Sequence, residues 1–179
     1  TTEIYTLSLH DALPIYTPPW CVRQCLDVVL PAVIKEPKTI LEPSAGAGAF
    51  IDPLRMRFPS AEIVAMDLDE GVGPWKGADE SLHGNFLDSG DVLSGLLSAR
   101  KHPHFDLVIG NPPYDQAFEF VDQAISIAEN VAFLVRSSFL SSCRRTKFFR
   151  DECRPTHVFL LAHRPSFTGH GSDYAEYCW

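Results

Sequence analysis

The residues with the most specific chemistry in this sequence stand at the end of an apolar run. Residues 105–110 are typical of a buried strand, and the next four residues are Asn111, Pro112, Pro113 and Tyr114. Proline has no N–H to donate to a β-ladder, and it pushes the residue before it towards extended geometry. The predicted strand therefore stops in a stiff corner, and open α/β sheets bind ligands at the carboxyl ends of their strands.

This corner could recognise an amine that carries two hydrogens. The side-chain oxygen of Asn111 can accept one hydrogen bond. The carbonyl of Pro112 can accept another, because no predicted helix or β-ladder uses it. Tyr114 offers an aromatic face on which a base can stack. The same four residues also fit an ordinary proline-rich turn with a packed tyrosine, so the rest of the chain has to decide between the two interpretations.

A second group of residues has the layout of a nucleotide-binding loop. Thr39–Leu41 is predicted to be a short strand, and a helix is predicted to follow and to reach about Phe58. The tight loop after the strand consists of Glu42, Pro43, Ser44, Ala45, Gly46, Ala47, Gly48, Ala49 and Phe50. Small residues at this place let a ligand approach the backbone closely. The loop lacks the full Gly-x-Gly-x-x-Gly pattern, so it needs support from other motifs.

Acidic and amide residues follow the next two predicted strands. The strand Ala61–Met66 ends in Asp67, with Asp69 close behind. A carboxylate at the end of the second strand, about 20 residues after the glycines, commonly binds the ribose hydroxyls. We predict this role for Asp67, with Asp69 as the alternative, although Asp67 could instead cap the following turn. Asn85 could bond an adenine edge and Phe86 could pack on its face, or both could be ordinary loop and core residues.

Helices and strands alternate along the rest of the chain. A first helix is expected to begin with Thr17 as its N-cap and Pro18 at its first position, and to be ended by Pro31 and the polar run to Lys38. Further helices are predicted over residues 91–99, 115–129 and 138–153, and further strands over 131–135 and 157–162. This alternation predicts a doubly wound, mostly parallel α/β sheet.

Charge and cysteine content narrow the classes of function. The formal net charge of −8 is unlike that of a general nucleic-acid binder, which is usually basic. A basic group can nevertheless be local, and the predicted helix 138–153 carries Arg144, Arg145, Lys147 and Arg150, which could contact phosphates or form a solvated face. Five cysteines without Cys-x-x-Cys spacing predict reduced thiols in a cytoplasmic protein, with no disulfide and no metal site. No apolar run approaches membrane-spanning length.

The two ends of the sequence differ from the rest of the chain. Thr1–Ile15 resembles, residue for residue, the conceptual translation of a common sequencing adapter, so we interpret it as an artefact and assign no role to His10 or Asp11. Glu3 and Asp11 contribute −2 to the net charge of −8, which leaves −6 for the remainder. Tyr177–Trp179 reads as the middle of a strand, so we expect a fragment that continues beyond both ends.

Four segments together resemble the class I S-adenosylmethionine-dependent methyltransferases. In the order and spacing of that family they are Thr17-Pro18-Pro19, Leu41–Phe50, Asp67 and Asn111–Tyr114. They are most similar to the DNA adenine-N6 branch in which the cofactor loop precedes the catalytic loop. The resemblance covers residues 16–179 and implies one catalytic domain. Its sheet would be Rossmann-like, mostly parallel and seven-stranded, with a truncated antiparallel last strand that starts at Tyr174.

The resemblance implies S-adenosyl-L-methionine as the cofactor. Thr17 and the Glu42–Gly48 loop would hold its methionine part, and Asp67 would take the ribose hydroxyls. The family usually has Asp at the position of Asn85, whose amide oxygen can still accept from the adenine amine. The candidate cofactor-binding residues are thus Thr17, Glu42, Pro43, Ser44, Ala45, Gly46, Gly48, Asp67, Asn85 and Phe86.

The resemblance also implies the catalytic and substrate-binding residues. Asn111, Pro112, Pro113 and Tyr114 would be catalytic, and Tyr114 would also stack on the target base. Phe167 stands where the family often has an aromatic residue that flanks this base. From the basic cluster we add Arg144 and Arg145 as candidate contacts to the substrate.

These residues predict transfer of a methyl group to the N6 amine of an adenine flipped out of duplex DNA, as in restriction–modification systems. Methylation of an RNA base amine or of a protein glutamine amide is the alternative, because both reactions use Asn-Pro-Pro-Tyr. Glu42-Pro43-Ser44 favours DNA, since the glutamine enzymes tend to have Asp and an extra glycine there. A non-catalytic cofactor-fold or nucleic-acid-binding module is the alternative outside enzymes. A separate target-recognition domain could lie beyond the C-terminal end.

Overall fold

The computed structural model describes residues 16–88, 92–99, 103–167 and 173–179, so the adapter-like segment lies outside the described residues. Its main sheet has five parallel strands in the order β3-β2-β1-β4-β5. These strands are β1 (Thr39–Glu42), β2 (Glu62–Asp67), β3 (Glu80–His83), β4 (Leu107–Gly110) and β5 (Val131–Phe133). The strand order reverses between β1 and β4, so the crevice for a ligand is expected at the carboxyl ends of these two strands.

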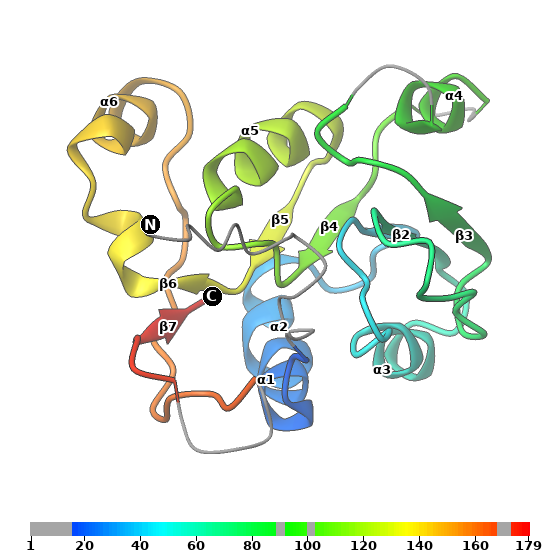
Figure 1. Cartoon of the computed structure of the whole chain (residues 1–179), viewed down its shortest axis with the longest axis horizontal. Helices are drawn as coiled ribbons and strands as arrows, with labels where there is room; N and C mark the ends of the chain where they lie inside the picture. Colours follow the sequence, from blue (N-terminus) through cyan, green and yellow to red (C-terminus); the bar gives the residue numbers. More distant parts are fainter. Residues whose placement is uncertain (1–15, 89–91, 100–102, 168–172) are drawn as a thin grey trace, which may run out of the picture.

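Helices cover both faces of the sheet. They are α1 (Pro19–Gln24), α2 (Leu30–Val33), α3 (Ile51–Arg57), α4 (Val92–Ala99), α5 (Ala117–Ile127) and α6 (Cys143–Asp151). In Figure 1, α1, α2 and α3 lie on one side of the sheet, and α4 and α5 lie on the other. Neighbouring strand residues point to opposite faces, so Ile40 packs into the core under α1–α3 while Leu41 packs into the core under α4 and α5. The predicted doubly wound α/β fold is thus confirmed.

The chain leaves the parallel sheet after β5 and pairs in the opposite direction. β6 (Val135–Arg136) is antiparallel to β7 (Tyr177–Cys178), as predicted for the last strand. The other side of β7 makes a single antiparallel bridge to Leu160. Around this bridge Phe159 exchanges two backbone hydrogen bonds with Trp179, and the N–H of Leu161 donates to the carbonyl of Tyr177, so the pairing is limited to the middle of the predicted strand 157–162. Within the described residues, the predicted seven-stranded sheet is instead a sheet of five strands and a separate pair.

Three helix predictions need correction. Pro18, rather than Thr17, is the N-cap of α1, and the Thr17 hydroxyl contacts another part of the chain, as described below. Pro31 does not end the first helix, because the π-helical turn Cys25–Val29 precedes it and Pro31 falls in the first turn of α2, where its missing N–H costs little. The predicted helix 138–153 is instead a 3₁₀ turn, Ser137–Leu140, followed by α6.

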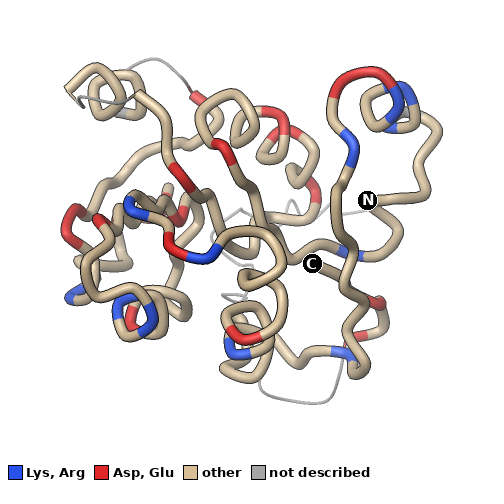
Figure 2. The backbone as a smooth tube through the Cα atoms, turned by 180° about the vertical axis from the view of Figure 1, so that it is seen from behind, with Lys and Arg blue, Asp and Glu red and all other residues tan. Residues whose placement is uncertain are grey.

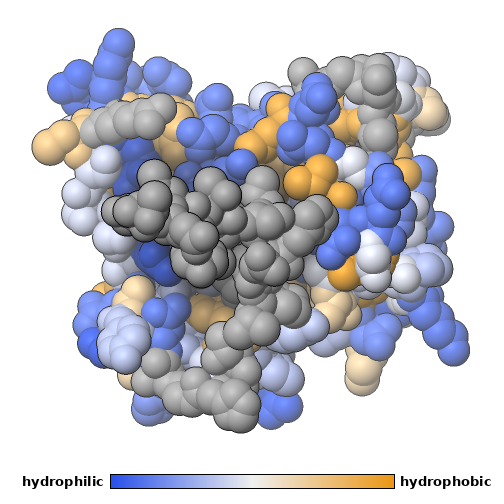
Figure 3. Space-filling model, in the orientation of Figure 1, coloured by the Kyte–Doolittle hydropathy of each residue, from blue (hydrophilic) through white to orange (hydrophobic). Residues whose placement is uncertain are grey.

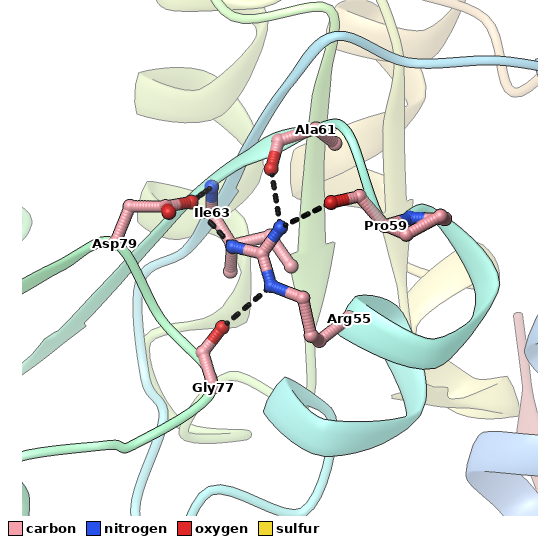
Figure 4. A network of polar contacts seen from close by, with 6 residues as sticks. All are labelled: Arg55, Pro59, Ala61, Ile63, Gly77 and Asp79. Carbon is pink, nitrogen blue, oxygen red and sulfur yellow. Dashed lines mark hydrogen bonds and ion pairs between the residues drawn. The ribbon is translucent and has the colours of Figure 1, made fainter.

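An arginine ties α3 to the connection between β2 and β3 (Figure 4). Arg55 Nε donates to the carbonyl of Gly77 at 3.0 Å, and Nη1 donates to the carbonyls of Pro59 and Ala61 at 3.0 and 2.8 Å. Nη2 pairs with the carboxylate of Asp79, whose Oδ2 also accepts from the Ile63 N–H at 2.7 Å. The network thus joins the residues that lead into β2 to the residues that lead into β3.

The surface view shows hydrophilic side chains with smaller apolar groups between them (Figure 3). Large exposed apolar side chains include Met56, Leu68 and Tyr174. No helix within the described ranges is long and apolar enough to cross a membrane.

Candidate active site

The loops that follow β1 and β4 meet at the point where the strand order reverses. Glu42 ends β1 and Gly110 ends β4. A Cβ atom at Gly110 would lie 3.5 Å from Oγ of Ser44 and 3.6 Å from Cγ of Glu42, so the two loops are in close contact. The Ser44 hydroxyl also donates to the backbone carbonyl of Asn111 at 3.4 Å. The tertiary structure thus brings together two motifs that lie about seventy residues apart in the sequence.

Asn111 is held by its amide nitrogen, and its amide oxygen is free. Nδ2 donates to Oγ1 of Thr17 at 3.1 Å, and Thr17 is buried. Oδ1 is buried without a hydrogen-bond partner in the described structure. The carbonyl of Pro112 likewise accepts no hydrogen bond from the residues described. The corner therefore has two acceptors without a described partner, on adjacent residues.

Tyr114 is packed by aromatic residues from the C-terminal part of the chain. Its ring centroid lies 5.2 Å from that of Tyr177 and 5.9 Å from that of Phe167, and the guanidinium carbon of Arg136 lies 4.9 Å from it. Burial and the nearby Tyr177 raise the pKa of Tyr114, while the Asn111 amide and Arg136 oppose this shift. The phenol is therefore neutral at physiological pH and cannot serve as a base.

Asp67 closes the small-residue loop from the side of β2. Its Oδ2 accepts from the N–H of Gly46 at 2.7 Å, and Oδ1 accepts from the N–H of Asp69 at 2.9 Å. Gly46 and Gly48 have φ values of +50° and +79°, which residues with a side chain rarely adopt. Each carboxylate oxygen can accept more than one hydrogen bond, so Asp67 can hold the loop and still accept from a ligand.

Glu42 carries a buried carboxyl group at the start of this loop. It is 1% exposed, and its Oε2 has no hydrogen-bond partner among the residues that the structure describes. Burial, and secondarily the negative charge of Asp67, raise the pKa of Glu42 well above its usual range. An unpaired buried acceptor is costly unless a partner arrives, so Glu42 is suited to a cationic or donor group of a ligand.

The remaining loop residues shape the backbone. Pro43 and Ala45 are buried, and the N–H of Ala45 donates to the carbonyl of Met66 at 2.9 Å. Pro113 is exposed, and its carbonyl accepts from the N–H of Gln116 at 3.1 Å, just before α5. These residues contribute geometry, and the side-chain acceptors of the site come from their neighbours.

Asn85 is exposed in the structure, whereas the neighbouring Phe86 is buried. Asn85 is exposed, and its Oδ1 accepts from the N–H of Leu87 at 3.0 Å, which leaves capacity for a further donor. Phe86 is 2% exposed and packs on Phe120 at a centroid distance of 5.0 Å. A ligand could therefore contact the backbone of Phe86, while its ring belongs to the core under α4 and α5.

Only one of the two arginines predicted to contact the substrate has a described side chain. Arg145 Nε donates to the carbonyl of Phe139 at 2.7 Å, and Nη2 donates to that of Ser138 at 3.2 Å, so this guanidinium caps the 3₁₀ turn. The side chain of Arg144 lies outside the described part of the chain. Figure 2 shows that basic residues occur on several elements and that those of α6 adjoin acidic ones.

Sequence reasoning missed three residues that contact the predicted site. Trp75 contacts the small-residue loop, and Arg136 and Tyr177 surround Tyr114. Their sequence neighbourhoods carry no motif, and only Trp75, which follows a Gly-Pro pair, stands at a recognisable turn. Within the described ranges, no three His, Cys, Asp or Glu side chains are grouped to hold a metal ion. All five cysteines are free thiols.

Solved structures with this fold include methyltransferases, whereas no family model matches the chain. A putative hemolysin from Streptococcus thermophilus superposes with a TM-score of 0.59 at 11% identity, over 91% of this chain and 65% of that one. A "predicted O-methyltransferase" from Agrobacterium tumefaciens superposes with a TM-score of 0.53 at 16% identity, over 78% and 71%. The chain thus has the Rossmann-like fold of methyltransferases.

Two curated relatives are more similar in sequence. A release factor glutamine methyltransferase from Corynebacterium glutamicum is 30% identical over an alignment of 124 residues that covers 64% of this chain and 42% of the relative. A type II methyltransferase from Paramecium bursaria Chlorella virus XZ-6E is 30% identical over 79 residues, or 44% and 19%. The chain spans less than half the length of either relative. Both relatives are methyltransferases, and the similarity to each covers only part of its length.

Proposed function

We propose that this chain carries the catalytic region of an S-adenosylmethionine-dependent methyltransferase that acts on the N6 amine of adenine in DNA. The observation that carries the proposal is the state of the Asn111 side chain. Its nitrogen is engaged by Thr17, its oxygen is buried and unpaired, and the carbonyl of the following residue, Pro112, accepts no hydrogen bond from the described residues. Two free acceptors on adjacent residues match an amine with two hydrogens, and an unpaired buried acceptor otherwise lowers stability.

The residues at the ends of β1 and β2 fit the proposed cofactor. The buried, unpaired Oε2 of Glu42 offers an acceptor for a cationic group, and Asp67 offers acceptors for hydroxyls. Thr17 Oγ1 accepts from Asn111, so its own hydrogen is available to a carboxylate. Bound there, S-adenosylmethionine would supply an electrophilic methyl group on a positively charged sulfur.

The chain's own residues would act by positioning and electrostatics. An exocyclic base amine is a poor nucleophile because its lone pair is delocalised into the ring. Hydrogen bonds from both amine hydrogens to Asn111 Oδ1 and the Pro112 carbonyl would favour a pyramidal nitrogen with a directed lone pair. The neutral phenol of Tyr114 would contact the substrate without taking a proton. A duplex substrate would have to present its adenine flipped out of the stack.

DNA is favoured as the substrate by the Glu42-Pro43-Ser44 loop and by the similarity to a type II methyltransferase. A protein glutamine amide is the second candidate. Its support is the match to a release factor glutamine methyltransferase over the longer part of this chain. Both substrates present an NH₂ group on an sp² carbon, so the same corner could serve either.

The experiment that tests the proposal is transfer of tritium from labelled S-adenosylmethionine. Duplex DNA, RNA and a glutamine-bearing peptide are offered separately, and labelled products are digested to nucleosides or amino acids. Asn111→Ala should abolish transfer and leave cofactor binding intact. The matched control is Asn130→Ala, which removes an amide that donates to the Asp106 carbonyl at 3.0 Å, near the amino-terminal ends of β4 and β5.

The products separate the alternatives. Label in N6-methyladenine from DNA supports the proposal, whereas label in the peptide or in RNA replaces the substrate and keeps the role of the corner. Full activity of Asn111→Ala would refute the role assigned to the corner. Cofactor binding without transfer to any substrate would favour the non-catalytic module.

A further inference from the structure

An indole ring fills the space above the second glycine of the loop. A Cβ atom at Gly48 would lie 2.6 Å from Cδ1 and 3.3 Å from Nε1 of Trp75, which is 7% exposed. Trp75 comes from residues 68–79, the connection between β2 and β3. Gly48 therefore makes room for a side chain of this protein. The sequence alone attributes this glycine to the close approach of a ligand.

The same indole fixes the first glycine. Trp75 Nε1 donates to the carbonyl of Gly46 at 2.9 Å, and the N–H of Gly46 donates to Asp67 Oδ2 at 2.7 Å. Both backbone polar groups of Gly46 are thus held, one by the predicted ribose-binding carboxylate and the other by Trp75. A residue with φ of +50° has alternatives close in energy when it is glycine, so these two bonds select its conformation.

Trp75 is itself held firmly in place. Its N–H donates to Oγ of Ser81 in β3 at 3.2 Å, and its carbonyl accepts from the N–H of Ala78 at 2.9 Å. Four residues further on, the network of Arg55 and Asp79 anchors the same connection to α3 and β2 (Figure 4). The indole is consequently a rigid support that reaches the loop from outside the four recognised motifs.

We propose that Trp75 is a positioning residue for the cofactor, one that holds Gly46 and Gly48 in the conformation in which the loop and Asp67 bind S-adenosylmethionine. This inference rests on the proposed function of the site. Because Trp75 acts on the loop rather than on the acceptors at Asn111 and Pro112, its loss should weaken cofactor binding and spare the rate of methyl transfer at saturation.

The test compares Trp75→Phe with Trp20→Phe in the full chain. Trp20 lies in α1, is 39% exposed and serves as the control for loss of an indole. Removal of one hydrogen bond and its packing should raise the Kd and KM for S-adenosylmethionine about five- to tenfold in Trp75→Phe. Its kcat should equal that of the wild type, and Trp20→Phe should keep wild-type values throughout. Calorimetric titration with S-adenosylmethionine and S-adenosylhomocysteine gives Kd.

The outcomes separate the two proposals. If the wild type binds neither compound, the proposed function falls and the role of Trp75 falls with it. If the wild type binds and Trp75→Phe binds equally tightly, only the role of Trp75 is refuted. A second measurement uses the double variant W20F/W179F, in which Trp75 is the sole tryptophan. Cofactor should change its fluorescence, and an unchanged emission during binding would refute the inference even if Trp75→Phe does not fold.

Discussion

Thr17→Val isolates the contact that orients the proposed catalytic amide. Valine matches the shape of threonine and removes the oxygen that accepts from Asn111 Nδ2 at 3.1 Å. Thr17 is only 8% exposed, so water cannot readily replace the lost acceptor. A buried donor left unpaired costs about 1–3 kcal/mol. We therefore expect the free energy of unfolding to fall by that amount in urea denaturation.

The same variant should slow methyl transfer. If the hydrogen bond to Thr17 stabilises the reactive orientation of the Asn111 amide by about 1 kcal/mol, kcat should fall roughly five- to tenfold without it. Single-turnover assays at saturating cofactor measure this change. Thr17→Ser keeps the hydroxyl and should retain most of the rate. In an Asn111→Ala background, Thr17→Val should cost almost no further stability, since the partner is already missing. Wild-type stability and kcat in Thr17→Val would refute the reasoning.

Two further predictions concern the loop. Burial raises the pKa of Glu42 in the folded chain above its ordinary 4.5. At pH values between these two pKa values, Glu42 is protonated in the folded chain and ionised in the unfolded chain. The free energy of unfolding therefore falls as the pH rises through this range. Glu42→Gln should remove this slope and be more stable than the wild type at pH 7; identical pH profiles of the two proteins in urea denaturation would contradict it. Gly48→Ala places a Cβ against Trp75 at φ +79° and should cost at least about 1–2 kcal/mol in thermal unfolding. The control Gly95→Ala, in α4 with open space around it, should not destabilise; equal effects of the two alanines would count against the strained loop.

Much of the fold could be predicted from local sequence. The apolar runs that became β1, β2, β4 and β5 are buried on both faces, and such continuous runs are the usual sign of parallel strands. Local patterns failed where neighbours decided the outcome. Residues 157–162 have the composition of a strand, yet they lie at the edge beyond β7, and only the part from Phe159 to Leu161 pairs there.

The candidate site divides in the same way. Local motifs were enough to predict a cofactor site and an amine-binding corner from the order Thr17, small-residue loop, Asp67 and Asn111–Tyr114. The variants proposed above test the roles of these residues directly. The contacts that shape them join distant residues. Asn111 bonds to Thr17, and Trp75 bonds to Gly46 across the connection after β2. No spacing rule predicts these pairs.

The sequence by itself determined which groups are available: acceptors after a strand end, glycines that permit positive φ, and a carboxylate after the second strand. Each depends on a few adjacent residues, whose backbone preferences act locally. Only the tertiary structure decided that the nitrogen of Asn111 is engaged while its oxygen is free, that the carboxyl of Glu42 is buried with a raised pKa, and that an indole supports the loop. These properties arise from packing between segments that the strand order brings together, and burial then sets the cost of every unpaired polar atom.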